Sequence, residues 1–156
     1  MNRFCSTSES EAVVPADIHT IWDVLTNPEV LADLTPMLRH IEVDGDHWRW
    51  ELTSIRVLTT AVTPSFTEQM TFLRPSRIDF SHEPPPGRTE RVGADGVYRL
   101  DEVAGGTHLR ISLTISVDLP LGRAARPAVE RIMGAVIART GDRFSENLLR
   151  HLGLPT

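Results

Sequence analysis

Hydrophobic and polar residues alternate most regularly between positions 108 and 119. Every odd position from 109 to 119 carries Leu, Ile or Val, and every even position from 108 to 118 carries a polar or charged residue. Successive side chains of a strand point to opposite faces, so this pattern predicts an antiparallel strand with one buried and one solvated face. Pro120 follows directly and ends the strand.

Shorter runs of the same alternation predict further strands, separated by turn signals. Asp44-Gly45-Asp46 and Ala104-Gly105-Gly106 are typical of tight turns, and Pro84-Pro85-Pro86-Gly87 is a stiff connection that cannot lie inside a sheet. We expect strands at residues 8–14, 41–43, 48–52, 66–72, 78–80, 98–100 and 109–119.

Three segments have the spacing of helices instead. Apolar residues at positions 18, 21, 22 and 25 share one helical face. Asn27-Pro28-Glu29 begins a second short helix, because Asn caps well, Pro suits the first helical position and Glu favours the positive end of the dipole. A helical pattern over residues 123–152 predicts a third helix of roughly 40 Å, which would cross a small domain.

These elements predict an α+β protein in which residues 1–156 form a single domain. We expect a curved antiparallel sheet of about seven strands around a long C-terminal helix, with two short helices after the first strand. A sheet with one apolar face needs a cover, and the last helix is the only element large enough. A strongly twisted sheet bends around such a helix and leaves a gap that side chains need not fill.

Composition narrows the function classes. All 16 basic residues are arginine, so mechanisms that need a lysine amine are excluded, among them Schiff-base chemistry and the P-loop. The single cysteine, Cys5, excludes an internal disulfide, and no His/Cys cluster has zinc-ligand spacing. The chain contains no nucleophile elbow or dinucleotide fingerprint either. We therefore expect no metal and no cofactor.

Charge and hydropathy bear on partners and location. The formal charge is −5 and the arginines are spread along the chain, so the basic stripe of a nucleic-acid-binding protein is missing. No run approaches the roughly 18 apolar residues of a membrane span, and residues 1–6 lack the apolar stretch of a secretory signal. We expect a cytoplasmic monomer or homodimer with no nucleic-acid partner and no stable membrane insertion.

Several local motifs resemble the START-like, or SRPBCC, superfamily, which includes polyketide cyclases, lipid-transfer domains and plant allergens. The resemblance covers residues 8–153. It rests on Val14-Pro15-Ala16, Ile21-Trp22-Asp23-Val24-Leu25, Asn27-Pro28-Glu29, Gly96-Val97-Tyr98-Arg99-Leu100 and Gly105-Gly106-Thr107.

The resemblance implies a helix-grip fold whose cavity holds a lipid, a quinone or a polyketide-like molecule. One feature departs from the plant allergens, which carry a glycine-rich loop after their second strand. This chain has only Asp44-Gly45-Asp46 there, so ligands peculiar to that branch are not carried over.

Alternation places a set of large side chains on the concave face of the predicted sheet. For each one, packing in a solid core is the alternative to contact with a ligand. With three residues of the last helix, the predicted lining comprises Trp48, Trp50, Phe66, Glu68, Met70, Phe72, Phe80, His82, Tyr98, Met133, Ile137 and Gly141.

Glu68 and His82 are ionisable residues within this apolar set. A buried carboxylate without a partner is costly, so Glu68 would either pair or hold a proton at a raised pKa. The two residues lie on strands that are neighbours in sequence, so a Glu68–His82 pair is one arrangement. Exposure at the rim of the sheet and pairing with a nearby arginine are the others. The pair would orient a ligand hydroxyl or carbonyl, or act as acid and base.

Three functions fit this sequence. The first is binding or carriage of a small hydrophobic molecule. The second is a polyketide aromatase/cyclase acting on a poly-carbonyl chain, with Glu68 and His82 as the candidate catalytic residues. The third is a protein–protein interaction module, which would have a solid core. We favour binding, because apolar burial alone supplies micromolar affinity without any catalytic group.

Overall fold

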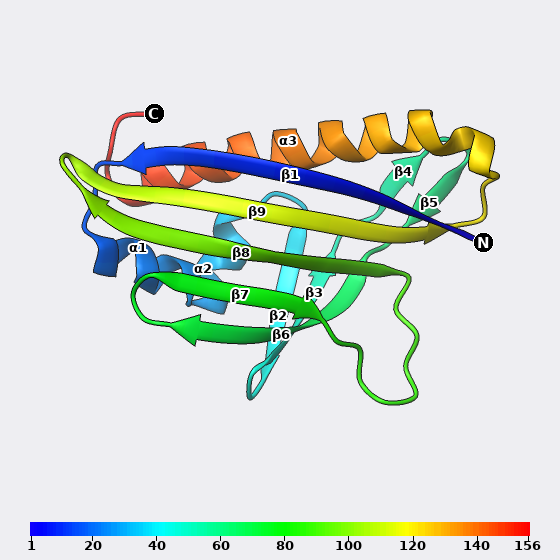
Figure 1. The fold of residues 1–156 in the computed structure, drawn as a ribbon, viewed down its shortest axis with the longest axis horizontal. Coiled ribbons are helices and arrows are strands. Elements are labelled where there is room, and N and C mark those ends of the chain that lie inside the picture. The colour runs from blue at the N-terminus through cyan, green and yellow to red at the C-terminus, as the bar shows by residue number, and fades with distance from the viewer.

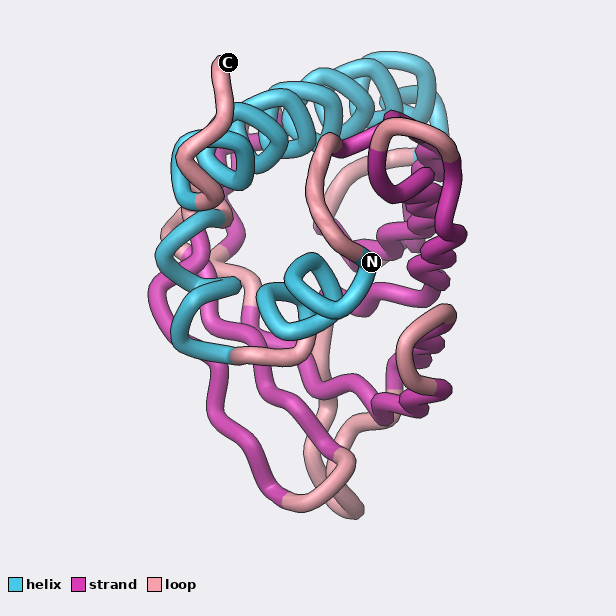
Figure 2. The backbone as a smooth tube through the Cα atoms, turned by 90° about the vertical axis from the view of Figure 1, so that its left-hand side faces the viewer, coloured by secondary structure: helices cyan, strands magenta, loops and turns pink.

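The structure is a computed structural model that describes residues 1–156. Seven strands form one antiparallel sheet in the order β1-β9-β8-β7-β6-β3-β2, and β4 pairs only with β5. The sheet curves around α3 (Figure 1), with α1 and α2 near one end (Figure 2). The elements are β1 (Asn2–Val14), α1 (Ile18–Leu25), α2 (Pro28–Leu34), β2 (Leu38–Asp44), β3 (His47–Leu52), β4 (Ile55–Val57), β5 (Thr60–Val62), β6 (Ser65–Leu73), β7 (Arg77–His82), β8 (Val92–Val103), β9 (Gly106–Leu119), the 3₁₀ turn η1 (Arg123–Ala125) and α3 (Arg126–His151).

The predicted α+β class, the curved antiparallel sheet and the long C-terminal helix are confirmed. Several predicted strands were too short or missing. The strand expected at residues 98–100 is β8, which spans Val92–Val103. β1 begins at Asn2 and not at residue 8, because it pairs with β9 over its whole length, from Asn2 opposite Leu119 to Val14 opposite Thr107. The hairpin β4–β5 was not predicted, since strands of three residues are too short to show alternation.

Two of the sequence motifs meet where β1 runs into α1. The Thr107 hydroxyl donates a hydrogen bond of 2.8 Å to the carbonyl of Ala16. Gly106, at φ 147°, lies against the same segment, and a Cβ there would be 2.1 Å from the Val14 carbonyl oxygen. The Gly-Gly-Thr motif therefore joins the β8–β9 hairpin to the start of α1.

The buried core is divided into two large clusters. One includes Trp22, Ile78 and Leu100 and receives Phe144 and Leu149 from the C-terminal part of α3. The other includes Phe4 and Leu119 together with Val129 and Met133 from the N-terminal part of α3. Partly buried Trp50, Leu52 and Leu113 pack against both clusters. Apolar side chains between the two clusters are thus less completely buried than those within each cluster.

Helix α3 is buried only toward its two ends. Val129, Met133 and Leu148 are 0%, 7% and 2% exposed, whereas no residue from 134 to 147 is buried. A polar anchor reinforces the C-terminal half, where the Asn147 side-chain amide donates a hydrogen bond of 2.9 Å to the Leu34 carbonyl at the end of α2. The middle of α3 therefore spans a space that it does not fill.

Candidate ligand-binding site

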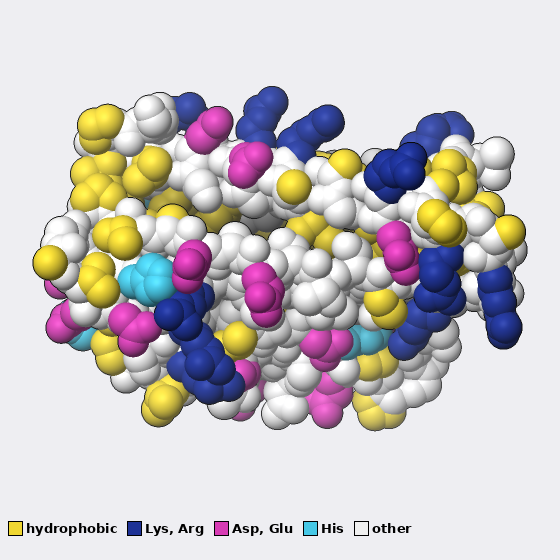
Figure 3. Space-filling view, turned by 45° about the horizontal axis from the view of Figure 1, so that its top comes forward, with side chains coloured by type: hydrophobic (Ala, Val, Ile, Leu, Met, Phe, Trp, Pro, Cys, Tyr) yellow, Lys and Arg dark blue, Asp and Glu magenta, His cyan; other side chains and the backbone are white.

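A largely apolar cavity of about 260 Å³ lies between the concave face of the sheet and the middle of α3. Of its 25 lining residues, 17 are hydrophobic. In Figure 3 a hollow with apolar side chains inside it runs alongside α3. A smaller apolar space of about 80 Å³ continues beneath the β4–β5 hairpin. It shares six residues with the main cavity, namely Ile55, Pro64, Val92, Ile115, Val136 and Ile137.

Strand register explains which side chains reach the cavity. Trp50 lies opposite Phe66, and Ile111 lies opposite both Tyr98 and Ser10. Residues opposite each other in an antiparallel pair point to the same face, so these side chains form continuous rows across the inner surface. The cavity wall is thus set by the pairing of β1, β9, β8, β7, β6 and β3.

Seven of the twelve predicted lining residues line the cavity. They are Trp50, Phe66, Glu68, Phe80, Tyr98, Ile137 and Gly141. Two aromatic pairs are among them. The Trp50 and Phe66 rings are stacked with centroids 6.4 Å apart, and the Phe80 and Tyr98 rings are tilted with centroids 5.2 Å apart. The wall therefore offers flat aromatic surfaces to a guest molecule.

The other five predicted lining residues lie elsewhere. Trp48 and Met70 are buried in the cluster that contains Trp22, and Phe72 packs edge-on against Trp22 with ring centroids 6.3 Å apart. Met133 belongs to the cluster near the start of α3 and lines only the smaller apolar space. His82 lines neither space. Trp48, Met70 and Phe72 lie on the predicted face of the sheet. They are at the end of the sheet that α1 covers, so they do not line the cavity.

The predicted Glu68–His82 pair does not form. The two residues are opposite each other across β6 and β7, as expected. His82 Nε2 instead lies 3.0 Å from Oε1 of Glu90, whose side chain is 1% exposed. Glu90 also accepts hydrogen bonds from the backbone N–H and the hydroxyl of Thr67, at 2.7 and 2.8 Å. Glu90 comes from an irregular loop, so no periodicity in the sequence could have indicated it.

Glu68 is the only ionisable carboxyl group in the cavity wall. Its Oε2 atom is buried and has no hydrogen-bond partner. Burial raises the pKa of Glu68 well above its usual value of 4.5, and the negative charge of Asp95 raises it further. Burial, with a smaller contribution from Glu68, also raises the pKa of Tyr98. The Trp50 indole Nε1 is a second buried polar atom without a partner.

Helix α3 contributes one glycine at a position where a side chain would narrow the cavity. Gly141 lines the cavity, and a Cβ built on it would meet no atom within 4 Å. A Cβ on Gly134, seven residues earlier, would likewise meet no atom within 4 Å, although Gly134 does not line the cavity. Neither glycine is therefore packed closely against a strand.

Several lining residues were not predicted. Ser8, Ser10 and Thr140 contribute small polar groups, and the segment from Thr35 to Leu38 passes over the cavity between α2 and β2. Serines at positions 6, 8 and 10 alternate along β1 and were the available signal for its inner face. The segment after α2 has no periodicity that could have placed it.

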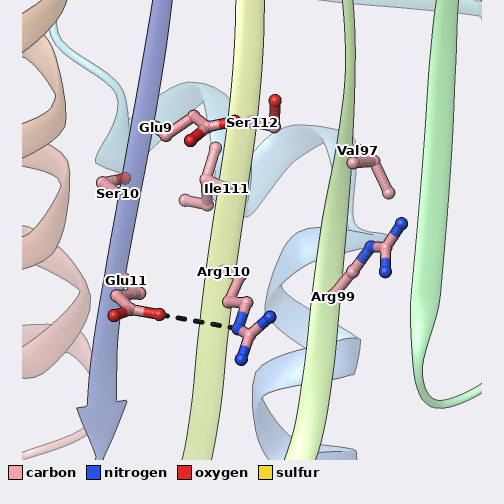
Figure 4. A pocket seen from close by; sticks show the side chains of 8 residues that line it. All are labelled: Glu9, Ser10, Glu11, Val97, Arg99, Arg110, Ile111 and Ser112. Atoms are coloured by element: carbon pink, nitrogen blue, oxygen red, sulfur yellow. Dashed lines mark ion pairs between the residues drawn. The ribbon is translucent and has the colours of Figure 1, made fainter.

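A second, polar depression of about 530 Å³ lies over β1, β9 and β8. Figure 4 shows its side chains, including the ion pair between Glu11 Oε2 and Arg110 Nε at 3.5 Å. Both partners are more than half exposed. Only two of its eight lining residues are hydrophobic, so it lacks the apolar wall of the cavity under α3. The cavity under α3 is therefore the candidate site.

Residues 6–148 match the family described as polyketide cyclase / dehydrase and lipid transport. The chain belongs to this family. The predicted membership of the START-like superfamily is thereby confirmed. No curated protein shows significant sequence similarity to this chain.

Solved structures of other proteins share the fold of this chain. A protein from Thermus thermophilus superposes with a TM-score of 0.70 at 17% identity, covering 93% of this chain and 98% of the other. A START superfamily protein from Mycobacterium smegmatis gives 0.64 at 13% identity, covering 91% and 93%. The di-domain ARO/CYC StfQ of the steffimycin biosynthetic pathway gives 0.64 at 12% identity, covering 92% of this chain and 49% of StfQ. At these identities the likeness concerns the fold alone.

Two further features bear on partners. No helix of the structure combines the length and apolar character needed to span a membrane. No group of three or more His, Cys, Asp or Glu side chains is arranged to hold a metal ion.

Proposed function

We propose that this family member binds or carries a small hydrophobic molecule, such as a lipid, a quinone or a polyketide-like compound, within residues 1–156 as one ligand-binding domain. The observation that carries the proposal is the space under the middle of α3. Large apolar side chains on both sides of it, such as Leu113 in β9 and Phe144 in α3, remain only partly buried because nothing covers them.

The size of the cavity limits the guest. Its volume corresponds to about nine water molecules at roughly 30 Å³ each, below the range of about 300–1,000 Å³ typical of sites for drug-sized ligands. A compact ring system or a short chain fits such a space better than a two-chain lipid does. Burying about 300 Å² of apolar ligand surface contributes roughly 7 kcal/mol before ordering costs.

Native mass spectrometry of freshly purified protein tests the proposal. We expect a fraction of the protein to carry a bound small molecule, which solvent extraction then identifies. An unliganded mass, together with no heat of binding for any apolar probe, would contradict it.

A polyketide aromatase/cyclase is the second candidate, favoured by one observation. Glu68 and Tyr98 place two titratable groups in the wall of an otherwise apolar cavity. His82, the predicted base, is held by Glu90 outside the wall, which leaves the reaction without the expected acid–base pair. Loss of turnover of a poly-carbonyl substrate in Glu68→Gln, with binding retained, would favour the enzyme over the carrier.

A further inference from the structure

On the basis of the proposed function, we propose that the cavity selects an uncharged ligand with a hydrogen-bond acceptor, such as a ketone oxygen, that contacts Glu68. Ligands that carry a carboxylate are rejected. Fatty acids and other apolar anions would then be poor ligands, although their hydrocarbon parts suit the wall.

The first argument is the set of ionisable residues in the cavity wall. No arginine and no histidine is among the 25 lining residues, and Glu68 is the one carboxyl group. A ligand carboxylate buried there would have no cation to pair with and would face a second acid. Burying an unpaired charge is strongly unfavourable, so the wall discriminates by charge.

The second argument is the position of the nearby basic side chains. His82 lies across from Glu68 in the sheet, but its Nε2 is 3.0 Å from Glu90. Arg88 Nε is 3.5 Å from the same carboxylate. Glu90 therefore holds both basic side chains, and the acid in the wall has no basic partner.

The third argument is that two buried polar atoms have no hydrogen-bond partner. Glu68 Oε2 and Trp50 Nε1 are both buried without a hydrogen-bond partner, and both residues line the cavity. Burial raises the pKa of Glu68, which favours the neutral acid, and a neutral carboxyl group has an O–H to donate. An indole N–H is a donor only. Both atoms have almost no surface accessible from the empty cavity, so a side-chain rotation must bring each one to the ligand. A buried donor without a partner favours such a contact with a ligand acceptor.

Three probes of nearly equal shape test this selectivity by isothermal titration calorimetry at pH 7. They are 2-acetylnaphthalene, which has a ketone oxygen, 2-isopropenylnaphthalene, in which a CH₂ group replaces that oxygen, and 2-naphthoate, which is an anion. We expect the ketone to bind at least tenfold more tightly than the alkene, and the naphthoate to bind more weakly than either.

Two variants assign the effect to the carboxyl group. Glu68→Leu should reduce the affinity for the ketone to that for the alkene, and Glu68→Gln should keep part of the preference because its amide can donate. Thermal unfolding shows whether each variant is folded. If the alkene binds as well as the ketone, or the naphthoate binds as tightly, the inference is wrong while the carrier function stands. If no probe binds, both fail.

Discussion

His82 Nε2 lies 3.0 Å from Glu90 Oε1, although the residue opposite His82 in the sheet is Glu68. The pairing between β7 and β8 ends with Phe80 opposite Gly96, and the backbone N–H of His82 then bonds to the side chain of Asp95. The sheet therefore opens at this end, and the Glu90 carboxylate fills the opening. Glu68 in the cavity wall does not pair with His82, because His82 contacts Glu90 at this end of the sheet.

The contact between His82 and Gly93 gives the first prediction. A Cβ on Gly93 would be 2.4 Å from His82 Nδ1, so Gly93→Ala must displace the imidazole. We expect Gly93→Ala to lower the free energy of unfolding by about 1–3 kcal/mol. In a His82→Ala background the same change should cost much less, as measured by a double-mutant cycle in urea.

His82→Ala alone should leave ligand affinity within about twofold of the wild type, because the side chain does not line the cavity. Additive losses in the cycle would show that the steric contact is not the cause. A large loss of affinity in His82→Ala would place the imidazole in the binding site after all.

Glu90 gives the second prediction. Its side chain is 1% exposed and accepts hydrogen bonds from the Thr67 N–H and hydroxyl. Glu90→Ala leaves a buried N–H and an imidazole without their partner, so we expect a loss of about 3–5 kcal/mol in the free energy of unfolding. Hydrogen exchange at the Thr67 amide should accelerate.

Glu83→Ala in the same loop is the matched control. Glu83 pairs with His47, but both side chains are largely exposed, at 52% and 42%. An exposed ion pair contributes roughly 0–1 kcal/mol, so this variant should be close to wild type. Equal losses in the two variants would mean that burial of Glu90 is not decisive.

The sequence predicted which face of the sheet a side chain lies on better than it predicted where along the strand the cavity lies. Alternation placed Trp50, Phe66 and Tyr98 on the inner surface, because register and pleat follow from a period of two. It placed Trp48 and Phe72 on the same face, but they lie at the end where Trp22 of α1 packs. Which end of the sheet a helix covers depends on contacts between segments that are distant in the sequence. The periodicity of the sequence carries no information about those contacts.

The polar features of the site were predicted in part. Glu68 stood out as a carboxyl group within an apolar run, and the structure places it in the cavity wall with a raised pKa. The Glu68–His82 pair, one of the arrangements left open, does not form, because Glu90 reaches His82 from a loop of irregular backbone. Side chains from such loops are positioned by tertiary contacts alone.

Filling the cavity gives the third prediction. Val136 of α3 lines both apolar spaces and is only partly buried. Val136→Phe should occupy part of the void, so ligand affinity should fall at least tenfold while the unliganded protein loses no more than about 1 kcal/mol. Calorimetric binding and urea unfolding measure the two effects.

Ala138→Phe is the control on the same helix, since Ala138 is exposed. It should leave affinity unchanged. If Val136→Phe binds ligand as the wild type does, the guest does not occupy the space under the middle of α3.

The raised pKa of Glu68 gives the last prediction, a loss of stability as the pH rises. Below its ordinary value of 4.5 the carboxyl group is protonated in both the folded and the unfolded chain. Above 4.5 the unfolded chain releases the proton while the folded chain keeps it, so the folded state binds more protons and the free energy of unfolding falls with increasing pH. The fall ends at the folded-state pKa, where burial and the charge of Asp95 no longer prevent ionisation.

Glu68→Gln has no carboxyl group at this position and should lack that component of the pH dependence. The difference in unfolding free energy between wild type and Glu68→Gln, measured in urea from about pH 4 to about pH 9, should therefore shift in favour of the variant as the pH rises. The affinity of the wild type for 2-acetylnaphthalene should decline over the same window, since an ionised carboxylate cannot donate to a ketone. A pH-independent difference would mean that Glu68 is ionised in the fold, and the neutral donor in the cavity wall would be ruled out.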